Sequence, residues 1–157
     1  MALLAQREHS AMELRRKLQR IARDRRLAEA DPANEPSIDE AADAGGLEEE
    51  VDAVLVWLKA NGYLDESRFV ESRIHVRSQR FGQRRIEQEL AQHGLSMDAE
   101  QRATLAAGEL DRACELLRRK FGEEPPADAA AEAKRLRFLM GRGFGSELAR
   151  KAVRQVR

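Results

Sequence analysis

The chain has 157 residues, of which 36% are charged and 4% aromatic, and its 28 basic and 28 acidic side chains give a net charge of zero. The dominance of Leu, Ala, Glu and Arg suits helices and leaves little material for a β-sheet. Its single cysteine excludes an intramolecular disulfide, and the sequence lacks a signal peptide and any apolar run near the ~20 residues of a membrane span, which predicts a cytoplasmic protein.

The charges are separated along the chain. Residues 1–30 carry 8 basic and 4 acidic side chains, and residues 31–52 carry 9 acidic and no basic ones. Residues 134–157 then carry 8 basic side chains and 1 acidic one. Two basic ends on either side of an acidic stretch indicate an anionic partner more strongly than the overall charge does.

Helix signals begin close to the N-terminus. The first predicted helix covers residues 10–21, where Ser10 and Glu13 stand at capping-box spacing and Leu14, Leu18 and Ile21 share one face. The stretch that follows, "EADPANEPSIDEAADAGGLEEE", is acidic, rich in Ala, Pro and Gly, and lacks aromatic residues. This composition predicts a flexible insert.

The remaining elements are predicted to be helical as well. Helices are expected over 47–62, 65–80, 82–94, 128–143 and 145–156, with one or two more over 96–122. The helix over 47–62 ends at Gly62, a residue type that commonly follows the last turn of a helix. Because no segment alternates with a period of two, we predict an all-α fold.

One helix-start pattern recurs along the sequence. "RFGQRRIEQEL" (80–90) and "GFGSELARKAV" (143–153) both carry Phe-Gly and then a basic helix with apolar positions four apart, and "EHSAMELRRKL" (8–18) fits the same frame. A small residue before the helix suits an N-cap. We therefore predict an elongated tandem array of three-helix repeats with three units, the first incomplete.

The expected boundaries follow from this pattern. Residues 1–29 form a partial first repeat, 30–47 the acidic insert, 48–108 the second repeat and 109–157 the third. The residues that define the repeat are interpreted mainly as core or corner residues; they are Ser10, Leu14, Leu18, Trp57, Gly62, Tyr63, Asp65, Phe69, Phe81, Gly82, Ile86, Leu90, Phe144 and Gly145.

Three of these stretches, taken in order, carry a resemblance to a known family. "REHSAMELRRKL", "VLVWLKANGYLDESRFVES" and "FGQRRIEQELAQHGL" are similar to the RecX family, whose members modulate the bacterial RecA recombinase. The resemblance implies an all-helical fold of three-helix repeats without catalytic activity. It also implies binding to the RecA–DNA filament and restraint of its ATPase, its growth and its strand exchange in recombination and SOS repair. The acidic insert is longer than the family usually carries there, and the chain begins almost at the first motif, so a basic N-terminal extension is expected to be missing.

Basic side chains recur in all three expected units. Arginine suits a polyanion or an acidic groove, because its planar guanidinium binds phosphate or carboxylate through two parallel hydrogen bonds. The residues predicted to form a basic face against the filament or DNA are Arg15, Arg16, Lys17, Arg73, Arg77, Arg80, Arg84, Arg85, Arg135, Arg142, Arg150, Lys151 and Arg154.

Catalysis and metal binding find no support in the sequence. His9, His75 and His93 lie far apart and have no cysteine partner at ligand spacing. The stretch "GRGFG" (141–145) joins two predicted helices and follows no strand, unlike a phosphate-binding loop. We therefore expect no catalytic residue, no metal, no cofactor and no small-molecule substrate.

Two other functions remain open beside a RecA-filament regulator. One is a helical protein that binds DNA without sequence preference and acts by competing for single-stranded DNA, in which case binding should be sensitive to salt. The other is an adaptor that contacts another protein through the acidic insert. In each case we expect a monomer that does not bind membranes.

Overall fold

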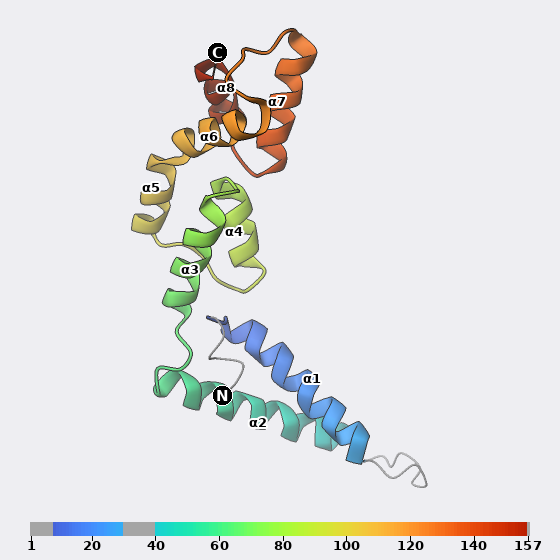
Figure 1. The fold of residues 1–157 in the computed structure, drawn as a ribbon. Helices are drawn as coiled ribbons and strands as arrows, with labels where there is room; N and C mark the ends of the chain where they lie inside the picture. Colours follow the sequence, from blue (N-terminus) through green and yellow to red (C-terminus); the bar gives the residue numbers. More distant parts are fainter. Residues whose placement is uncertain (1–7, 30–39, 157) are drawn as a thin grey trace. The chain divides into compact units, whose positions relative to one another are not determined.

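Eight α-helices make up the part of the chain that the computed structural model describes, which is residues 8–29 and 40–156. No strand occurs among these residues, so the all-α prediction is confirmed. The helices are α1 (Ala11–Glu29), α2 (Glu40–Ala60), α3 (Glu66–Ser78), α4 (Gln83–Ala91), α5 (Ala99–Ala107), α6 (Glu109–Phe121), α7 (Ala129–Gly141) and α8 (Ser146–Gln155) (Figure 1). They fall into two units, residues 1–69 and residues 70–157, with the boundary inside α3.

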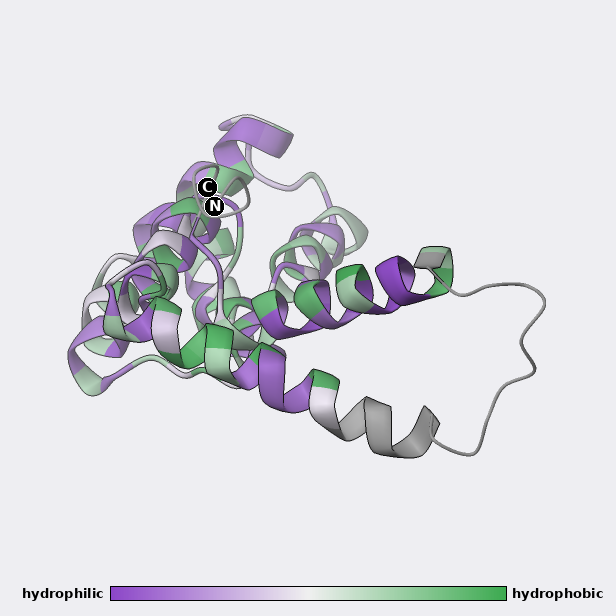
Figure 2. Ribbon diagram, turned by 90° about the horizontal axis from the view of Figure 1, so that it is seen from below, coloured by the Kyte–Doolittle hydropathy of each residue, from purple (hydrophilic) through white to green (hydrophobic). Residues whose placement is uncertain are grey.

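In the first unit, α1 and α2 lie side by side (Figure 1). Hydrophobic residues recur between hydrophilic ones along α1, as expected of a helix with one apolar side (Figure 2). Leu14 of α1 and Val51, Leu55 and Leu58 of α2 are buried in one apolar cluster that Leu64 closes at the end of α2. Full burial of such a side chain contributes about 1.5–3 kcal/mol, so this cluster holds the helix pair together.

The start of α1 follows the sequence prediction. The Ser10 hydroxyl accepts a hydrogen bond of 3.1 Å from the backbone N–H of Glu13, which satisfies one of the N–H groups that a helix start leaves unpaired. The backbone N–H of Ala11 donates to Glu66 Oε1 at 3.4 Å, and Lys59 Nζ lies 3.2 Å from Glu66 Oε2. Glu66 therefore joins the start of α1 to the end of α2.

Helix α2 differs from the expectation at its N-terminal end. It begins at Glu40, inside residues 30–47, which were expected to form a flexible insert; residues 30–39 lie outside the described residues. Acidic side chains stabilise the first turns of a helix, because their negative charge interacts favourably with the positive end of the helix dipole. The helix also packs on α1, whereas the expected boundary at residue 48 assigns most of it to the second repeat.

In the second unit, α6, α7 and α8 surround one apolar core (Figure 1). Its buried residues are Ala113, Cys114, Leu116, Leu117, Leu139, Phe144, Ala149, Ala152, Val153 and Val156. Small residues on α6 and α8 let these helices approach closely, and the Cys114 thiol reaches the carbonyl oxygen of Ala152 at 3.9 Å. Cys114 is thus buried, and burial raises the pKa of its thiol.

The two predicted Phe-Gly corners are helix starts. Gly82 precedes α4 and Gly145 precedes α8, each with extended backbone angles. The helix before each corner begins at an aspartate: Asp65 Oδ1 accepts from the N–H of Ser67 at 2.9 Å, and Asp128 Oδ1 accepts from the N–H of Ala131 at 2.7 Å. Local sequence signals therefore identify both ends of these helix–corner–helix segments.

The two corners touch each other. The N–H of Gly82 donates to the carbonyl oxygen of Arg142 at 2.9 Å. A Cβ atom on Gly82 would lie 2.5 Å from the carbonyl oxygen of Gly143, and Gly143 itself has a φ of +87° and lies against Arg85. Only glycine permits backbones to approach so closely. This contact brings residues 80–85 and 142–145 together.

Candidate functional site

Arginine side chains gather around the ring of Phe81, at the corner between α3 and α4. The guanidinium carbon of Arg77 lies 4.2 Å from the ring centroid, and those of Arg85 and Arg142 lie 5.9 Å from it. The negative face of an aromatic ring attracts cations at such distances. Phe81 therefore holds together three cations that would otherwise repel one another.

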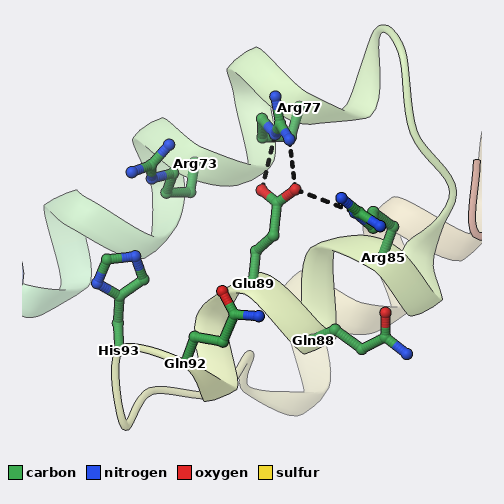
Figure 3. Close-up of a pocket in the computed structure, with 7 residues that line it drawn as sticks. All are labelled: Arg73, Arg77, Arg85, Gln88, Glu89, Gln92 and His93. Carbon is green, nitrogen blue, oxygen red and sulfur yellow. Dashed lines mark hydrogen bonds and ion pairs between the residues drawn. The ribbon is translucent and has the colours of Figure 1, made fainter.

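The carboxylate of Glu89, on α4, binds two of these arginines. Arg77 Nε donates to Glu89 Oε2 at 2.7 Å, Arg77 Nη2 donates to Glu89 Oε1, and Arg85 Nε approaches Glu89 Oε1 at 3.4 Å (Figure 3). The hydrogen bond from Arg77 lowers the pKa of Glu89, and the same bond raises the pKa of Arg77. Glu89 is therefore ionised at neutral pH and pairs α4 with α3.

A cleft of about 370 Å³ opens beside this ion pair, between α3 and α4. Figure 3 shows Arg73 and Arg77 on α3, with the other residues on α4 or just after it. The lining residues are Arg73, Arg77, Arg85, Gln88, Glu89, Gln92 and His93. All of them are polar, and Glu89 is the one carboxylate among them, so the cleft is suited to an anion.

Arg142 reaches the corner from the other Phe-Gly segment. Its Nη1 donates to the carbonyl oxygen of Arg80 at 3.1 Å, and its guanidinium also lies 4.6 Å from the centroid of the Phe138 ring. In the same region, Arg84 Nη2 lies about 4.0 Å from the place that a Cβ on Gly145 would take. Arginines that are distant in the sequence are therefore neighbours here.

We refer to this set as the arginine cluster; it consists of Arg73, Arg77, Arg80, Arg84, Arg85 and Arg142. Arg80, Arg84 and Arg85 are exposed, and the other three are half-buried. The structure thus brings together six of the thirteen residues predicted to form the basic face.

Arg135 does not belong to an exposed basic face, and this part of the prediction is wrong. Its side chain is 5% exposed, with Nη2 donating to the carbonyl oxygen of Glu124 at 2.6 Å and Nη1 to that of Val156 at 3.5 Å. It also lies 5.6 Å from the centroid of the Phe121 ring. The buried Arg135 guanidinium thus has its hydrogen-bond partners in two backbone carbonyl groups, before α7 and after α8, which is a structural role.

The basic residues of α8 are exposed and partly paired. Arg150 forms an ion pair with Glu147 one turn earlier on the same helix. Lys151 and Arg154 are exposed on α8 as well. These side chains remain predicted members of a basic face.

The basic residues of α1 belong to the first unit and have local partners. Arg15 Nη2 lies 2.5 Å from Asp52 Oδ1, and Lys17 Nζ lies 3.6 Å from Glu13 Oε1. Arg16 Nη2 lies 3.4 Å from the sulfur of Met12. A single stripe running from these residues to the arginine cluster stays a prediction.

Two aromatic residues of the resemblance motifs lie at a corner and are not in the core. Trp57 is 50% exposed and Tyr63 is 46% exposed, and their rings stack at 5.7 Å with 19° between the planes. By contrast, Phe69, Phe144, Ile86 and Leu90 are buried. The Trp57–Tyr63 pair closes the turn after α2, and about half of the surface of each residue remains exposed.

Two acidic residues of the site were not singled out from the sequence. Glu89 stands four residues after Arg85, a spacing at which helical side chains meet, so this signal was present. Glu109 lies on α6, and its Oε1 accepts a 2.7 Å hydrogen bond from the N–H of Gln83 at the start of α4. No local spacing predicts that contact, because 26 residues separate its partners.

Neither a metal site nor a membrane span is present in the part of the chain that the structure describes. No group of three or more His, Cys, Asp or Glu side chains could hold a metal ion there. No described helix is long and apolar enough to cross a bilayer.

These features define an all-helical protein of three-helix domains with an arginine-rich corner. A sequence model of the second three-helix domain of RecX matches residues 65–101, and one of the third matches residues 107–153. The chain is 43% identical over 153 residues to the regulatory protein RecX of Leptothrix cholodnii, covering 96% of this chain and 82% of that one.

Two further relatives carry the same name. Identity to the regulatory protein RecX of Herbaspirillum seropedicae is 39% over 151 residues, covering 95% of this chain and 82% of the relative. Identity to the regulatory protein RecX of Escherichia coli O1:K1 / APEC is 38% over 147 residues, covering 90% of this chain and 80% of the relative. The chain belongs to the RecX family, a family of non-enzymatic regulatory proteins. The resemblance drawn from the three sequence motifs is confirmed.

Proposed function

We propose that the chain regulates the RecA recombinase by binding the RecA–DNA filament, with the arginine cluster as the surface that approaches the DNA. Membership of the RecX family supports the regulatory role. The arrangement around Phe81 supports the surface, since three guanidinium groups lie near its ring and the neighbouring residues Arg80 and Arg84 of the same corner are exposed. A regulator of this kind acts where the chromosome is, so cytoplasmic location is part of the proposal.

Electrostatics accounts for how such a surface would work. Guanidinium groups that approach the phosphate backbone release condensed counterions, which gives affinity that does not depend on base sequence and falls with salt. The protein surface of the filament can add further contacts, and units that share one lattice gain affinity by avidity. Binding to the filament would then restrain ATP hydrolysis, growth and strand exchange.

The test is DNA-dependent ATP hydrolysis by RecA on single-stranded DNA, titrated with the chain and two double variants. Arg80→Ala with Arg84→Ala removes two exposed members of the arginine cluster. Arg118→Ala with Arg119→Ala removes two exposed arginines of α6 and serves as the matched control. Circular dichroism checks that each variant keeps its helix content.

We expect inhibition at amounts well below that of the recombinase. The cluster variant should need about 5- to 30-fold more protein, at about 0.5–1 kcal/mol for each of two charged contacts, while the control stays close to the unmodified chain. Equal effects of both double variants would contradict the proposed surface. Inhibition only when the protein is abundant enough to coat the DNA would favour simple competition for single-stranded DNA.

A further inference from the structure

Glu89 takes the place that an external anion would take in the arginine cluster. Its carboxylate accepts two hydrogen bonds from the fork of Arg77 and lies within ion-pair distance of Arg85 (Figure 3). A phosphate group binds a guanidinium through the same pair of parallel hydrogen bonds. An internal carboxylate and an external phosphate would therefore compete for the same donors.

Positive charge exceeds negative charge around this carboxylate. Arg77, Arg85 and Arg142 surround the Phe81 ring, and Arg73 lines the adjoining cleft. Among the described residues that line the cleft, Glu89 is the one acidic side chain. The cleft thus carries a surplus of positive charge that attracts an anion from solution.

The nature of the lining favours a phosphate over a protein segment. Beside the charged groups, the cleft presents the side-chain amides of Gln88 and Gln92, and no apolar side chain lines it. A peptide commonly buries apolar side chains at the centre of its contact. A phosphodiester needs only donors, and amide and guanidinium groups are among those that bind backbone phosphates.

We propose that the cleft between α3 and α4 binds a phosphate group of a nucleic-acid backbone, and that Glu89 occupies the arginines as an internal competitor when no nucleic acid is bound. This inference rests on the proposed function and names the chemistry of its surface. When the phosphate enters, the Glu89 carboxylate leaves Arg77 and Arg85 and turns to solvent. Affinity for nucleic acid is thereby held below what the arginines alone would give.

Two observations support exchange at this place. The Arg77 guanidinium rests on Phe81 at 4.2 Å as well as on Glu89, so the ring keeps it in position after the carboxylate has left. Glu89 is ionised at neutral pH, because the hydrogen bond from Arg77 lowers its pKa. An ionised competitor lowers the affinity for another anion, whereas a neutral one would do so far less.

The experiment measures binding of the full chain to a fluorescein-labelled oligothymidylate by fluorescence polarisation, without recombinase. Glu89→Gln removes the competitor's charge. Glu87→Gln removes the same charge two residues earlier on α4, where Glu87 accepts from Gln83 at 3.0 Å and Arg102 at 3.3 Å and does not line the cleft. The comparison therefore separates the position of the charge from its general effect.

We expect Glu89→Gln to bind about 3- to 10-fold more tightly than both the unmodified chain and Glu87→Gln at low salt. Its log–log salt dependence should also be steeper by about 0.7, the value for one more phosphate contact on a single strand. Equal affinities of Glu89→Gln and Glu87→Gln would overturn the proposal and leave Glu89 as a structural ion pair only.

A second variant keeps the test decisive if Glu89→Gln loses helix content. Gln92→Glu places a second carboxylate in the cleft and retains the Glu89 ion pair, and Gln155→Glu on α8 adds the same charge elsewhere. We expect Gln92→Glu to weaken binding about 3-fold or more relative to Gln155→Glu, since a like charge in the cleft repels the phosphate. Equal binding of these two would also overturn the proposal.

Competitors distinguish the sources of the anion. Displacement of the oligonucleotide by pyrophosphate or ATP at the oligonucleotide's own affinity would assign the cleft to small phosphates, and displacement by polyglutamate would assign it to acidic peptides; either result overturns the backbone proposal. Because no recombinase is present, failure here leaves the ATPase test of the proposed function unaffected. Success here together with failure there would identify a DNA-binding protein that does not act on RecA.

Discussion

A carboxylate held by two guanidinium groups makes the stability of the Phe81 corner depend on pH. The pKa of Glu89 is lowered from its ordinary value of 4.5, mainly by the hydrogen bond from Arg77. Since the folded-state pKa lies below the unfolded one, the ion pair contributes stability above the unfolded pKa, and this contribution is lost as pH falls through the folded value.

We therefore predict that Glu89→Gln lowers the free energy of unfolding most at neutral pH. The difference from the unmodified chain should shrink as pH falls below the ordinary pKa of 4.5 and on through the lower pKa of the folded state, because the carboxylate is then protonated in the unmodified chain as well. Urea denaturation followed by circular dichroism at several pH values measures this. A difference that stays constant over the range would show that the charge of Glu89 contributes nothing.

At the scale of the helices, the two Phe-Gly corners meet through their backbones, so we expect an added side chain there to be costly. We predict that Gly82→Ala destabilises the chain by about 1–3 kcal/mol, because the new methyl group would lie 2.5 Å from the carbonyl oxygen of Gly143. Gly141→Ala is the matched control: no atom lies within 4 Å of its added Cβ, and the residue ends α7. It should be neutral or stabilising by up to about 1 kcal/mol.

Thermal denaturation of both variants tests this. If both variants had the same melting temperature, the close contact between the corners would not contribute to the stability of the chain. A loss confined to Gly82→Ala would support backbone contact between residues 80–85 and 142–145 as a condition for the arginine cluster.

The helix starts could be predicted from the sequence because their signals are local. Ser10, Asp65 and Asp128 accept hydrogen bonds from N–H groups two or three residues later, and Gly82 and Gly145 supply extended backbone just before a helix. Each signal lies within one turn of the element that it starts.

Contacts between distant segments could not be predicted in the same way. Spacing places Arg135 on a helix face but does not say whether that face meets backbone carbonyl groups of other segments or solvent. Helix α2 is apolar on several sides, with Val54, Val56 and Trp57 exposed beside buried Leu55. Apolar spacing predicts one face of Val51, Val54, Leu55 and Leu58, and all of these except Val54 are buried. Trp57, which was expected in the core or at a corner, is half-exposed.

The boundaries of the repeats also depend on contacts between distant segments. The second three-helix domain of RecX matches from residue 65, and α2 packs on α1 through Leu14, Val51 and Leu55. We propose that α2 belongs to the first repeat and that the second repeat starts with α3. The acidic, proline-containing stretch would then lie within the first repeat.

At the scale of the whole chain, the separation of charge raises the question of what the acidic stretch does. An adaptor that binds through this stretch needs its charges, whereas a filament regulator that uses the arginine cluster does not. Residues 31–52 carry 9 acidic side chains and no basic ones. Asp31, Glu35 and Asp39 can be neutralised together without changing the length of the chain.

We predict that the triple variant Asp31→Asn, Glu35→Gln and Asp39→Asn keeps inhibition of the RecA ATPase within about 2-fold, because charges that take no part in the contact contribute little to it. Loss of inhibition would instead favour contact through the acidic stretch. The same variant should be tested for oligonucleotide binding, where tighter binding would support the idea that the acidic stretch shields the basic surface.

The stacked pair at the end of α2 gives the protein a spectroscopic signal of its own. Trp57 is the one tryptophan of the chain, and the residue is 50% exposed. Indole emission moves to shorter wavelength when water is excluded. After subtraction of the filament's own emission, a blue shift on binding would mark the α2–α3 corner as covered, without any label. An unchanged spectrum with inhibition intact would leave that corner outside the contact.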